Sequence, residues 1–261
     1  MKPQRRPGFP PEIPDCPAGW STGPPDFVGI GAARAGTTWW FSLLTAHPDV
    51  VDVPTERKEL HFFDQFWDGS FEPQDAALYH QYFPRPAGSL AGEWTPRYML
   101  DAWVPRLIKA AAPETKLLVM LRDPVARYRS QLSIAVSRRG VEDPAGAPMA
   151  QDALARGMYL TQLERVLRHF PREQILMLQF ERCVADPEPE LRRTYEFIGL
   201  ERSDFVPAAV AERVNPGAPP FELQPDVVDD MTITLANEVR GLVELFPEID
   251  PGLWPSVRAL L

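Results

Sequence analysis

The 261-residue chain contains few of the side chains that form covalent cross-links or bind transition metals: it has two cysteines and four histidines. Cys16 and Cys183 lie far apart in the sequence and form no C-x-x-C pair. A disulfide framework is therefore not expected, and a reducing compartment, the cytoplasm, is the predicted location. The four histidines do not have the spacing of metal ligands, and we predict no metal site.

Long apolar runs and a positive net charge are also missing. No run approaches the roughly 20 apolar residues that span a bilayer, and the arginines near the N-terminus are not followed by the apolar segment of a signal peptide. The net charge of −9 argues against a general nucleic-acid binder, although a local cationic pocket could still bind a small anion. We predict neither a membrane span nor a nucleic-acid partner.

The alternation of short apolar runs with helix-like segments predicts the fold. Residues 1–25 are rich in proline and are expected to form an irregular arm, with 26–261 as a single domain. Strands are expected at Asp26–Gly31, Ser89–Trp94, Lys116–Leu121 and Gln174–Phe180. Helices are expected at Thr37–Ala46, Pro73–Phe83, Asp101–Ala112, Pro124–Ser137, Gln151–Phe170, Pro187–Ile198 and Met231–Phe246. A short strand or turn is expected at Glu59–Asp64, and loops at Val141–Pro148 and Asn215–Pro225.

This order indicates an α/β fold with a parallel sheet that helices cover on both faces. Ligands bind such sheets at the carboxyl ends of the strands. The functional residues are therefore expected just after Asp26–Gly31 and Lys116–Leu121.

The first of these segments has the glycine spacing of a phosphate-binding loop. Gly31–Thr38 reads G-A-A-R-A-G-T-T, which fits the pattern G-x-x-x-x-G-K-[ST] except that Thr37 stands in place of the lysine. Backbone N–H groups at a helix N-terminus suit a phosphate or sulfate, the hydroxyls of Thr37 and Thr38 add donors, and Arg34 adds a cation. The glycines alone could form an ordinary tight turn, but the combination favours anion binding.

The missing lysine separates two kinds of chemistry. A nucleotide triphosphatase uses that lysine and Mg²⁺ to offset concentrated phosphate charge. A sulfuryl group carries less negative charge, so a metal is less necessary, and Arg34 could stabilise the bridging oxygen as the bond breaks. A kinase or NTPase acting on a small molecule, and a non-catalytic nucleotide-binding protein, remain as alternatives.

Two segments resemble the donor-binding motifs of sulfotransferases that use 3′-phosphoadenosine-5′-phosphosulfate (PAPS). Gly31–Thr38 is similar to their 5′-phosphosulfate loop. Leu121–Ser130, L-R-D-P-V-A-R-Y-R-S, resembles their 3′-phosphate motif, in which Arg122 and Ser130 match the binding arginine and serine. The resemblance implies PAPS as donor and PAP as product, with no metal required. The cofactor-binding residues are then Arg34, Ala35, Gly36, Thr37, Thr38, Trp39, Arg122 and Ser130.

A third segment, E-L-H-F-F-D, resembles the E-x-x-F-F segment of the heparan-sulfate-type branch, whose glutamate is the catalytic base. That glutamate matches Glu59. His61 is the rival base, because cytosolic sulfotransferases use histidine, and a strand at Glu59–His61 would place both side chains on one face. Lys58 could contact the donor or acceptor, although a solvated charge is its more common role.

The resemblance spans roughly Asp26–Asn215 and includes a helix and strand common in bacterial members. It implies a P-loop-like three-layer sandwich that transfers a sulfuryl group to a hydroxyl of a carbohydrate, lipid or natural product. Catalysis would use Glu59 or His61 as base, with Arg34 stabilising the leaving phosphate.

The chain departs from the family pattern at two places. Glu93–Pro96 reads E-W-T-P where the family has E-K-T-P, so Trp94 is predicted to form an aromatic wall for the acceptor. The basic loop late in the family is not visible in residues 213–220.

Several other side chains are expected to have ordinary structural roles. Surface positions are predicted for Arg127 and Arg129, and an ion pair between Arg122 and Asp123 is the alternative to phosphate binding. Core packing is favoured for most of the aromatic residues Trp39, Trp40, Phe62 and Phe63.

Overall fold

A parallel five-stranded sheet forms the centre of the computed structural model, which describes residues 10–52, 58–139, 148–212 and 221–261. Its strands are β1 (Phe27–Gly31), β2 (Val50–Val51), β3 (Leu90–Trp94), β4 (Lys116–Leu121) and β5 (Ile175–Gln179). They lie in the order β2-β3-β1-β4-β5, and every neighbouring pair is parallel. All residues of β1 and β5 are buried, which explains their nearly continuous apolar sequences. The predicted α/β class and parallel sheet are confirmed.

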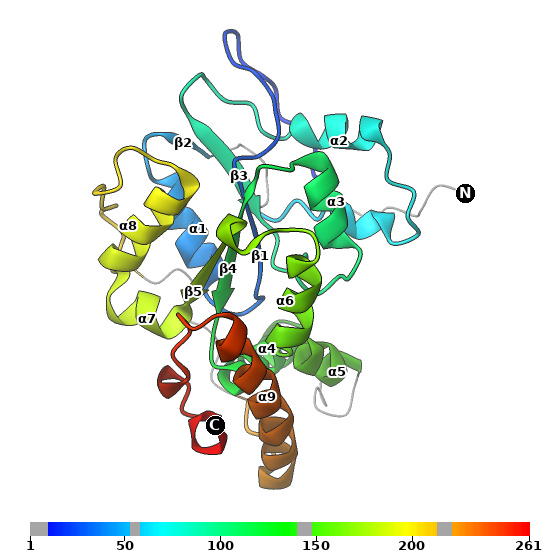
Figure 1. Cartoon of the computed structure of the whole chain (residues 1–261), viewed down its shortest axis with the longest axis vertical. Helices are drawn as coiled ribbons and strands as arrows, with labels where there is room; N and C mark the ends of the chain where they lie inside the picture. The colour runs from blue at the N-terminus through cyan, green and yellow to red at the C-terminus, as the bar shows by residue number, and fades with distance from the viewer. Residues whose placement is uncertain (1–9, 53–57, 140–147, 213–220) are drawn as a thin grey trace.

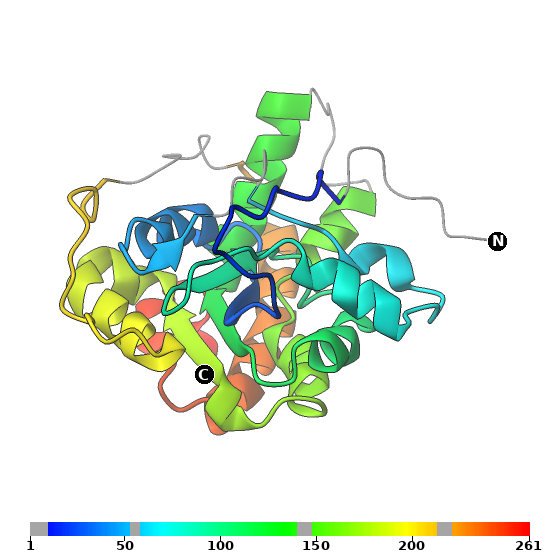
Figure 2. The ribbon, with the colours of Figure 1, turned by 90° about the horizontal axis from the view of Figure 1, so that it is seen from above.

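Helices cover both faces of this sheet (Figure 1). One layer holds α1 (Thr37–Thr45), α7 (Phe180–Ala185) and α8 (Pro187–Ile198). The other holds α2 (Pro73–His80), α3 (Val104–Ala111) and α6 (Tyr159–Leu167). Figure 2, seen from above, separates the same two layers.

Three further helices lie at the end of the molecule toward which β4 points (Figure 1). They are α4 (Pro124–Arg139), α5 (Pro148–Ala155) and α9 (Pro225–Leu245). Short 3-10 turns occur at Phe63–Phe66, Arg172–Gln174, Pro251–Leu253 and Arg258–Leu260.

The order of the strands places a switch point beside β1. From β1 the chain continues to β2 and β3 on one side, and then crosses to β4 and β5 on the other. The loops after β1, β3 and β4 therefore meet at the carboxyl edge of the sheet, where ligands bind in folds of this kind.

The structure corrects several predicted element bounds. The helix expected at Gln151–Phe170 is two helices, α5 and α6, because the chain turns at Gly157, whose N–H donates to the carbonyl of Leu154. No strand forms within the described residues of Glu59–Asp64. The last long helix starts at Pro225, six residues before the expected Met231. The loop expected at Val141–Pro148 lies almost wholly outside the described residues.

Candidate active site

The loop after β1 presents the N-terminus of α1 to the edge of the sheet. Gly36 precedes α1 with φ 88°, a left-handed conformation that favours glycine. A Cβ at this position would also lie 2.6 Å from the ring of Phe180. Thr37 and Thr38 occupy the first turn of α1, which contains no acidic residue. The predicted loop therefore has the backbone shape and the donors that an anion needs.

The residues predicted to bind a 3′-phosphate lie together with Arg34. The Nε and Nη2 atoms of Arg34 are each 3.4 Å from Ser130 Oγ. Arg122 donates from Nη1 to the backbone carbonyl of Arg34 at 3.3 Å, and its guanidinium lies over the ring of Phe180. Arg34 after β1, Arg122 just after β4 and Ser130 near the middle of α4 thus form one cationic cluster.

The predicted alternative for Arg122 was an ion pair with Asp123. Asp123 instead caps α4, because its Oδ1 accepts hydrogen bonds from the N–H groups of Val125 and Ala126, both at 3.0 Å. Its Oδ2 accepts from the N–H of Ser256 near the C-terminus. The carboxylate that follows Arg122 therefore organises a helix end.

A second cation, Lys58, reaches the threonines of the loop. Its Nζ is 3.1 Å from Thr37 Oγ1, 3.4 Å from Thr38 Oγ1 and 3.9 Å from Glu59 Oε1. Burial lowers the pKa of Lys58 to about 8, although the charges of Glu59 and Glu93 oppose that shift. In the nucleotide-binding loop pattern a lysine stands at the position of Thr37. Here Lys58, from a separate segment, supplies a cation at this place. From the sequence, a solvated charge was the favoured role of Lys58 over a contact with donor or acceptor. A local motif does not reveal contacts between segments that lie 21 residues apart.

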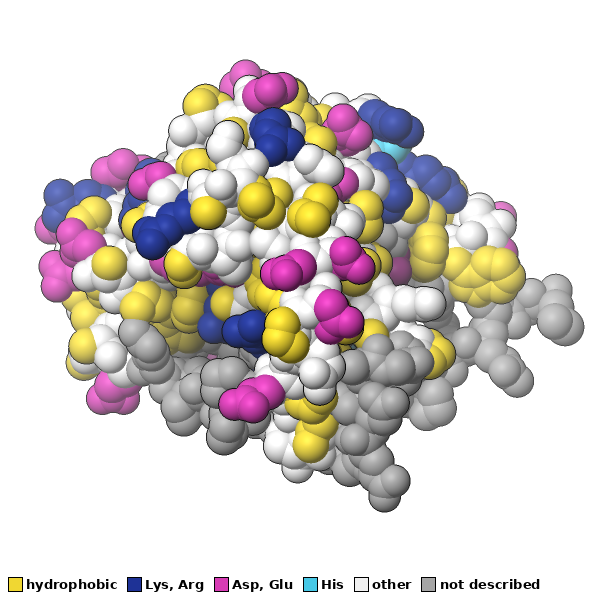
Figure 3. All heavy atoms as spheres, turned by 90° about the horizontal axis from the view of Figure 1, so that it is seen from below, with side chains coloured by type: hydrophobic (Ala, Val, Ile, Leu, Met, Phe, Trp, Pro, Cys, Tyr) yellow, Lys and Arg dark blue, Asp and Glu magenta, His cyan; other side chains and the backbone are white. Residues whose placement is uncertain are grey.

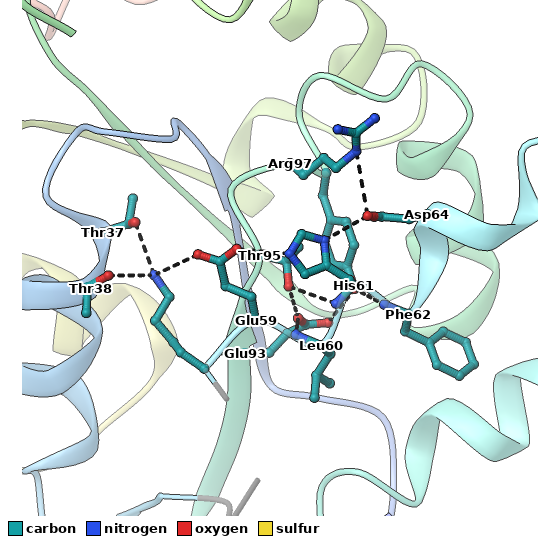
Figure 4. A network of polar contacts seen from close by, with 12 residues as sticks. Thr37, Thr38, Glu59, Leu60, His61, Phe62, Asp64, Glu93, Thr95 and Arg97 are labelled. Atoms are coloured by element: carbon teal, nitrogen blue, oxygen red, sulfur yellow. Dashed lines mark hydrogen bonds and ion pairs between the residues drawn. The ribbon is translucent and has the colours of Figure 1, made fainter. Parts of the chain in front are cut away.

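Glu59, His61 and Asp64 form a hydrogen-bonded row beside the loop (Figure 4). His61 Nε2 is 3.0 Å from Glu59 Oε2, and His61 Nδ1 is 2.7 Å from Asp64 Oδ2. Arg97 lies on the far side of Asp64, with its Nε 3.6 Å from Oδ2. His61 has φ 50°, so of the two forms predicted for this segment, a strand or a turn, the strand does not form, and Glu59 and His61 meet through a left-handed backbone conformation. Asp64 was missed, because its role depends on this conformation.

The charges of the row follow from its hydrogen bonds. Burial by itself lowers the pKa of His61, but hydrogen bonds with Asp64 and Glu59 raise it more, to about 9. At neutral pH His61 is therefore an imidazolium that donates from both ring nitrogens. Burial raises the pKa of Glu59, but the hydrogen bond from His61 and the charge of Lys58 outweigh it, and the net shift is downward. Glu59 is thus the ionised member of the pair that can accept a proton.

A cavity of about 610 Å³ runs past these groups. Arg34, Thr37, Thr38, Glu59 and His61 are among the residues that line it. Further lining residues come from α4, from α5 and the residue after it, and from the segment after β3: Ile134, Ala135, Pro148, Met149, Arg156, Pro96 and Arg97. The anion loop and the Glu59–His61 pair therefore face one shared space, which is large enough for a small-molecule ligand.

Two predicted surface or site residues are buried instead. Trp94 is fully buried, packs its ring against Gly29 of β1, and donates from its indole nitrogen to the carbonyl of Gly31 at 3.2 Å. The prediction of an aromatic acceptor wall is therefore wrong. Arg127 is also fully buried, where it donates to Gln131 Oε1 and to the carbonyl of Ala153. It connects α4 to α5, and burial lowers its pKa to about 10.

The remaining aromatic residues pack as expected. Trp39, Trp40, Phe62 and Phe63 all lie in the core. Trp39 contacts the ring of Trp40 edge-on, with 5.3 Å between ring centroids. Core packing is thus confirmed for these four side chains, while the cofactor contact predicted for Trp39 stays a prediction.

The described residues contain neither a group of metal ligands nor a membrane-spanning helix. In those residues no three His, Cys, Asp or Glu side chains are grouped as metal ligands. None of the helices in the same residues combines the length and apolarity needed to cross a bilayer.

The fold and the site together define a class. A parallel sheet of this order, with a glycine-bounded anion loop after its first strand, is a P-loop-like α/β fold, and a carboxylate–imidazolium pair facing that loop is suited to group transfer. Residues 24–215 match the Sulfotransferase domain. The chain belongs to the sulfotransferase family, whose sulfuryl donor is PAPS.

Individual relatives agree with this assignment. Human heparan sulfate glucosamine 3-O-sulfotransferase 3B1 is 33% identical over 217 residues, covering 74% of this chain and 52% of that protein. Human heparan sulfate glucosamine 3-O-sulfotransferase 6 is 32% identical over 189 residues, covering 68% and 53%. The chain thus spans about half the length of these curated relatives. The crystal structure of a sulfotransferase from Alicyclobacillus acidocaldarius aligns with TM-score 0.65 and 27% identity, covering 88% of this chain and 98% of that one.

Proposed function

We propose that this protein transfers the sulfuryl group of PAPS to a hydroxyl of an acceptor, with Glu59 as the general base. The observation that carries the proposal is the position of Glu59. It lies between Lys58 and the His61 imidazolium and lines the cavity that Thr37 and Thr38 also line. An ionised carboxylate and an anion-binding loop that face one space suit proton removal coupled to transfer of an anionic group.

The side chains of the site fit the two anionic ends of PAPS. Arg34, Arg122 and Ser130 would hold the 3′-phosphate, because they form one cluster of donors. Thr37, Thr38, Lys58 and the N-terminus of α1 would hold the 5′-phosphosulfate. PAPS supplies the activated sulfuryl group.

This arrangement shifts one predicted role. Arg34 was predicted to stabilise the leaving phosphate. Its guanidinium nitrogens instead lie 3.4 Å from the hydroxyl of Ser130, a residue of the proposed 3′-phosphate site. We therefore assign the bridging oxygen to Lys58 and the 3′-phosphate to Arg34.

The transfer follows from these positions. The acceptor oxygen attacks sulfur in line, its proton passes to Glu59, and the bond between sulfur and the bridging oxygen breaks to release PAP. Lys58 and the loop donors offset the charge that develops on the released 5′-phosphate. His61 has no free lone pair to accept a proton at neutral pH, so it orients Glu59 while Asp64 holds its other nitrogen.

The acceptor is proposed to be a neutral hydroxyl compound with an apolar portion, such as a glycoside, lipid or natural product. Arg156 and Arg97 line the cavity in which the acceptor would bind. Arg156 is paired with Asp152 at 2.7 Å and Arg97 with Asp101 at 2.8 Å, so both cations are largely neutralised. Ile134 and Met149 add apolar surface to the same cavity. On the face in Figure 3, basic and acidic side chains are interspersed with hydrophobic ones. A polyanionic chain would instead favour a continuous row of unpaired cations.

The proposed location is the cytoplasm. Cys16 is exposed and Cys183 is buried, and both thiols are free, which suits a reducing compartment.

The test combines donor binding with turnover. We expect PAP to bind without added metal with a Kd near 1 μM, about −8 kcal/mol. Glu59→Gln should lower sulfuryl transfer from PAPS at least about 100-fold, with the PAP Kd within about twofold of wild type. Glu201→Gln, at an exposed position, is the matched control and should keep full activity.

Each part of the proposal can fail separately in this experiment. Absence of PAP binding would overturn the donor. Retained transfer in Glu59→Gln would overturn the base. A panel of an alkyl glycoside, a phenol and a heparan sulfate oligosaccharide tests the acceptor class, and preference for the oligosaccharide would overturn it.

A further inference from the structure

Three consecutive backbone N–H groups of the segment that carries Glu59 and His61 are bound by side chains from the end of β3 and the turn after it. Leu60 N–H donates to Glu93 Oε2 at 3.4 Å, and His61 N–H donates to Thr95 Oγ1 at 3.4 Å. Phe62 N–H donates to Tyr98 Oη at 2.9 Å. Figure 4 shows Glu93 and Thr95 next to this segment.

The hydroxyl groups of Thr95 and Tyr98, which accept two of these bonds, themselves donate to the carboxylate of Glu93. Thr95 Oγ1 is 2.5 Å from Glu93 Oε2, and Tyr98 Oη is 3.1 Å from Glu93 Oε1. Because a backbone N–H can only donate, each hydroxyl oxygen accepts from the segment and its own hydrogen points to Glu93. Tyr79 of α2 donates to Glu93 Oε1 as well, at 2.7 Å. The two oxygens of Glu93 therefore accept four hydrogen bonds.

The segment needs this support because it has little of its own. Residues 58–62 form neither helix nor strand, and the first 3-10 turn starts at Phe63. His61 has φ 50°, which costs a non-glycine residue free energy unless its surroundings hold it there. Backbone N–H groups in such a buried segment must find partners, and Glu93, Thr95 and Tyr98 supply them.

We propose that Glu93 is a positioning residue for sulfuryl transfer, which fixes the backbone of Leu60–Phe62 and thereby the hydrogen-bonded pair of Glu59 and His61. The inference rests on the proposed role of Glu59. Glu93 is 2% exposed and lines a second cavity, of about 230 Å³, that Thr38 and Lys58 also line; it is not among the residues that line the 610 Å³ cavity. It acts through the segment and does not touch the reacting atoms.

A carboxylate is suited to this position, and an amide of the same shape is not. Glutamine has one acceptor oxygen and one NH₂ group that only donates, so two of the four donors that point at Glu93 would meet another donor. The volume of the side chain is nearly unchanged, and the loss is confined to the hydrogen bonds that hold the segment.

The test measures kinetics and donor binding in Glu93→Gln. We expect kcat to fall about 10- to 100-fold, because a shift of about 1 Å in a catalytic group has an effect of that size. Removing the charge of Glu93 lowers the pKa of Lys58 further, so PAP binding is measured at pH 6.5, where Lys58 stays protonated and the Kd should stay within about twofold. Hydrogen exchange of the Leu60, His61 and Phe62 amides should become faster, which loss of global stability alone would not confine to these residues.

A second pair of variants keeps the proposal testable if Glu93→Gln does not fold. Thr95→Val keeps the shape of the side chain but removes the hydroxyl that connects His61 N–H to Glu93, and Thr95→Ser retains it. We expect Thr95→Val to lose kcat and Thr95→Ser to restore most of it, at unchanged PAP affinity.

The outcomes separate this proposal from the base assignment. If Glu59→Gln is inactive while a folded Glu93→Gln, or Thr95→Val, turns over at the wild-type rate, the positioning role is wrong and the base assignment stands. If Glu59→Gln retains activity, the base assignment itself fails.

Discussion

At the scale of single residues, the electrostatics of His61 distinguish the two candidate bases. The motif contained both Glu59 and His61 and could not choose between them. The choice depends on Asp64, whose carboxylate contacts the second nitrogen of His61 and keeps the ring protonated. An imidazolium between two carboxylates stabilises the folded protein as well as orienting Glu59.

That stabilisation depends on pH. The pKa of His61 rises from 6.5 to about 9 on folding, so its contribution is complete below pH 6.5 and is lost as the pH rises through 9. We expect His61→Gln to lower the free energy of unfolding by on the order of 2 kcal/mol more at pH 6 than at pH 9.5, as measured by urea unfolding. His169→Gln removes an exposed imidazole and should have little effect at either pH. An equal loss for His61→Gln at both pH values would contradict the assignment.

The motifs predicted the residues that lie in contiguous stretches of sequence. Arg34, Thr37, Glu59 and Arg122 were predicted as site residues because each stands at a fixed position in a local pattern, and their roles stay predictions. Lys58 was considered as a contact of the donor or acceptor, but a solvated charge was favoured, because its contacts with Thr37 and Thr38 join separate segments. Trp94 was misjudged, because alternation along a strand does not tell which face of the sheet points toward a ligand.

At the scale of elements, the sheet was predictable because its strands are buried on both faces and are apolar throughout. The break between α5 and α6 was not, because the apolar positions on both sides of Gly157 continue one helical pattern. The start of α9 was placed too late, since its first turn is largely exposed and has no apolar face to detect.

The close packing of β1 on β3 gives a prediction at this scale. Gly29 pairs with Trp94, and a Cβ at Gly29 would lie 2.1 Å from the indole ring. Gly29→Ala should therefore destabilise the protein by about 3 kcal/mol, measured by denaturant unfolding. Gly23→Ala is the control, because its Cβ would lie 3.8 Å from Arg85, an ordinary contact. Wild-type stability in Gly29→Ala would show that β1 and β3 do not pack in this way.

At the scale of the whole molecule, the C-terminal segment secures the end of β4, next to Arg122, which we propose binds phosphate. Trp254 is fully buried and donates from its indole nitrogen to Glu181 Oε2 at 2.9 Å. Glu181 Oε1 accepts from the N–H of Asp123, next to Arg122. Trp254 and Asp123, about 130 residues apart in the sequence, are therefore connected through Glu181 at the end of β4.

The arm of residues 1–25 and the single domain of 26–261 stay a prediction.

Removing this anchor should affect the entire fold. Trp254→Ala is expected to cost about 3–5 kcal/mol in the free energy of unfolding, from the lost packing and from the hydrogen bond that Glu181 loses. Trp67→Ala, at a side chain that is 68% exposed, should change stability by less than about 0.5 kcal/mol. Calorimetric melting of both variants checks the prediction, and similar melting temperatures would refute it.

The hydrogen bonds that hold Leu60, His61 and Phe62 go to main-chain N–H groups. These hydrogen bonds do not depend on the side chains at these positions. The side chains of Leu60 and Phe62 are therefore constrained by packing and not by the bonds to Glu93, Thr95 and Tyr98. A proline at any of the three positions would remove one of the bonds, since proline has no N–H. During divergence of the family, position 60 can therefore change its apolar side chain while proline remains excluded from all three positions.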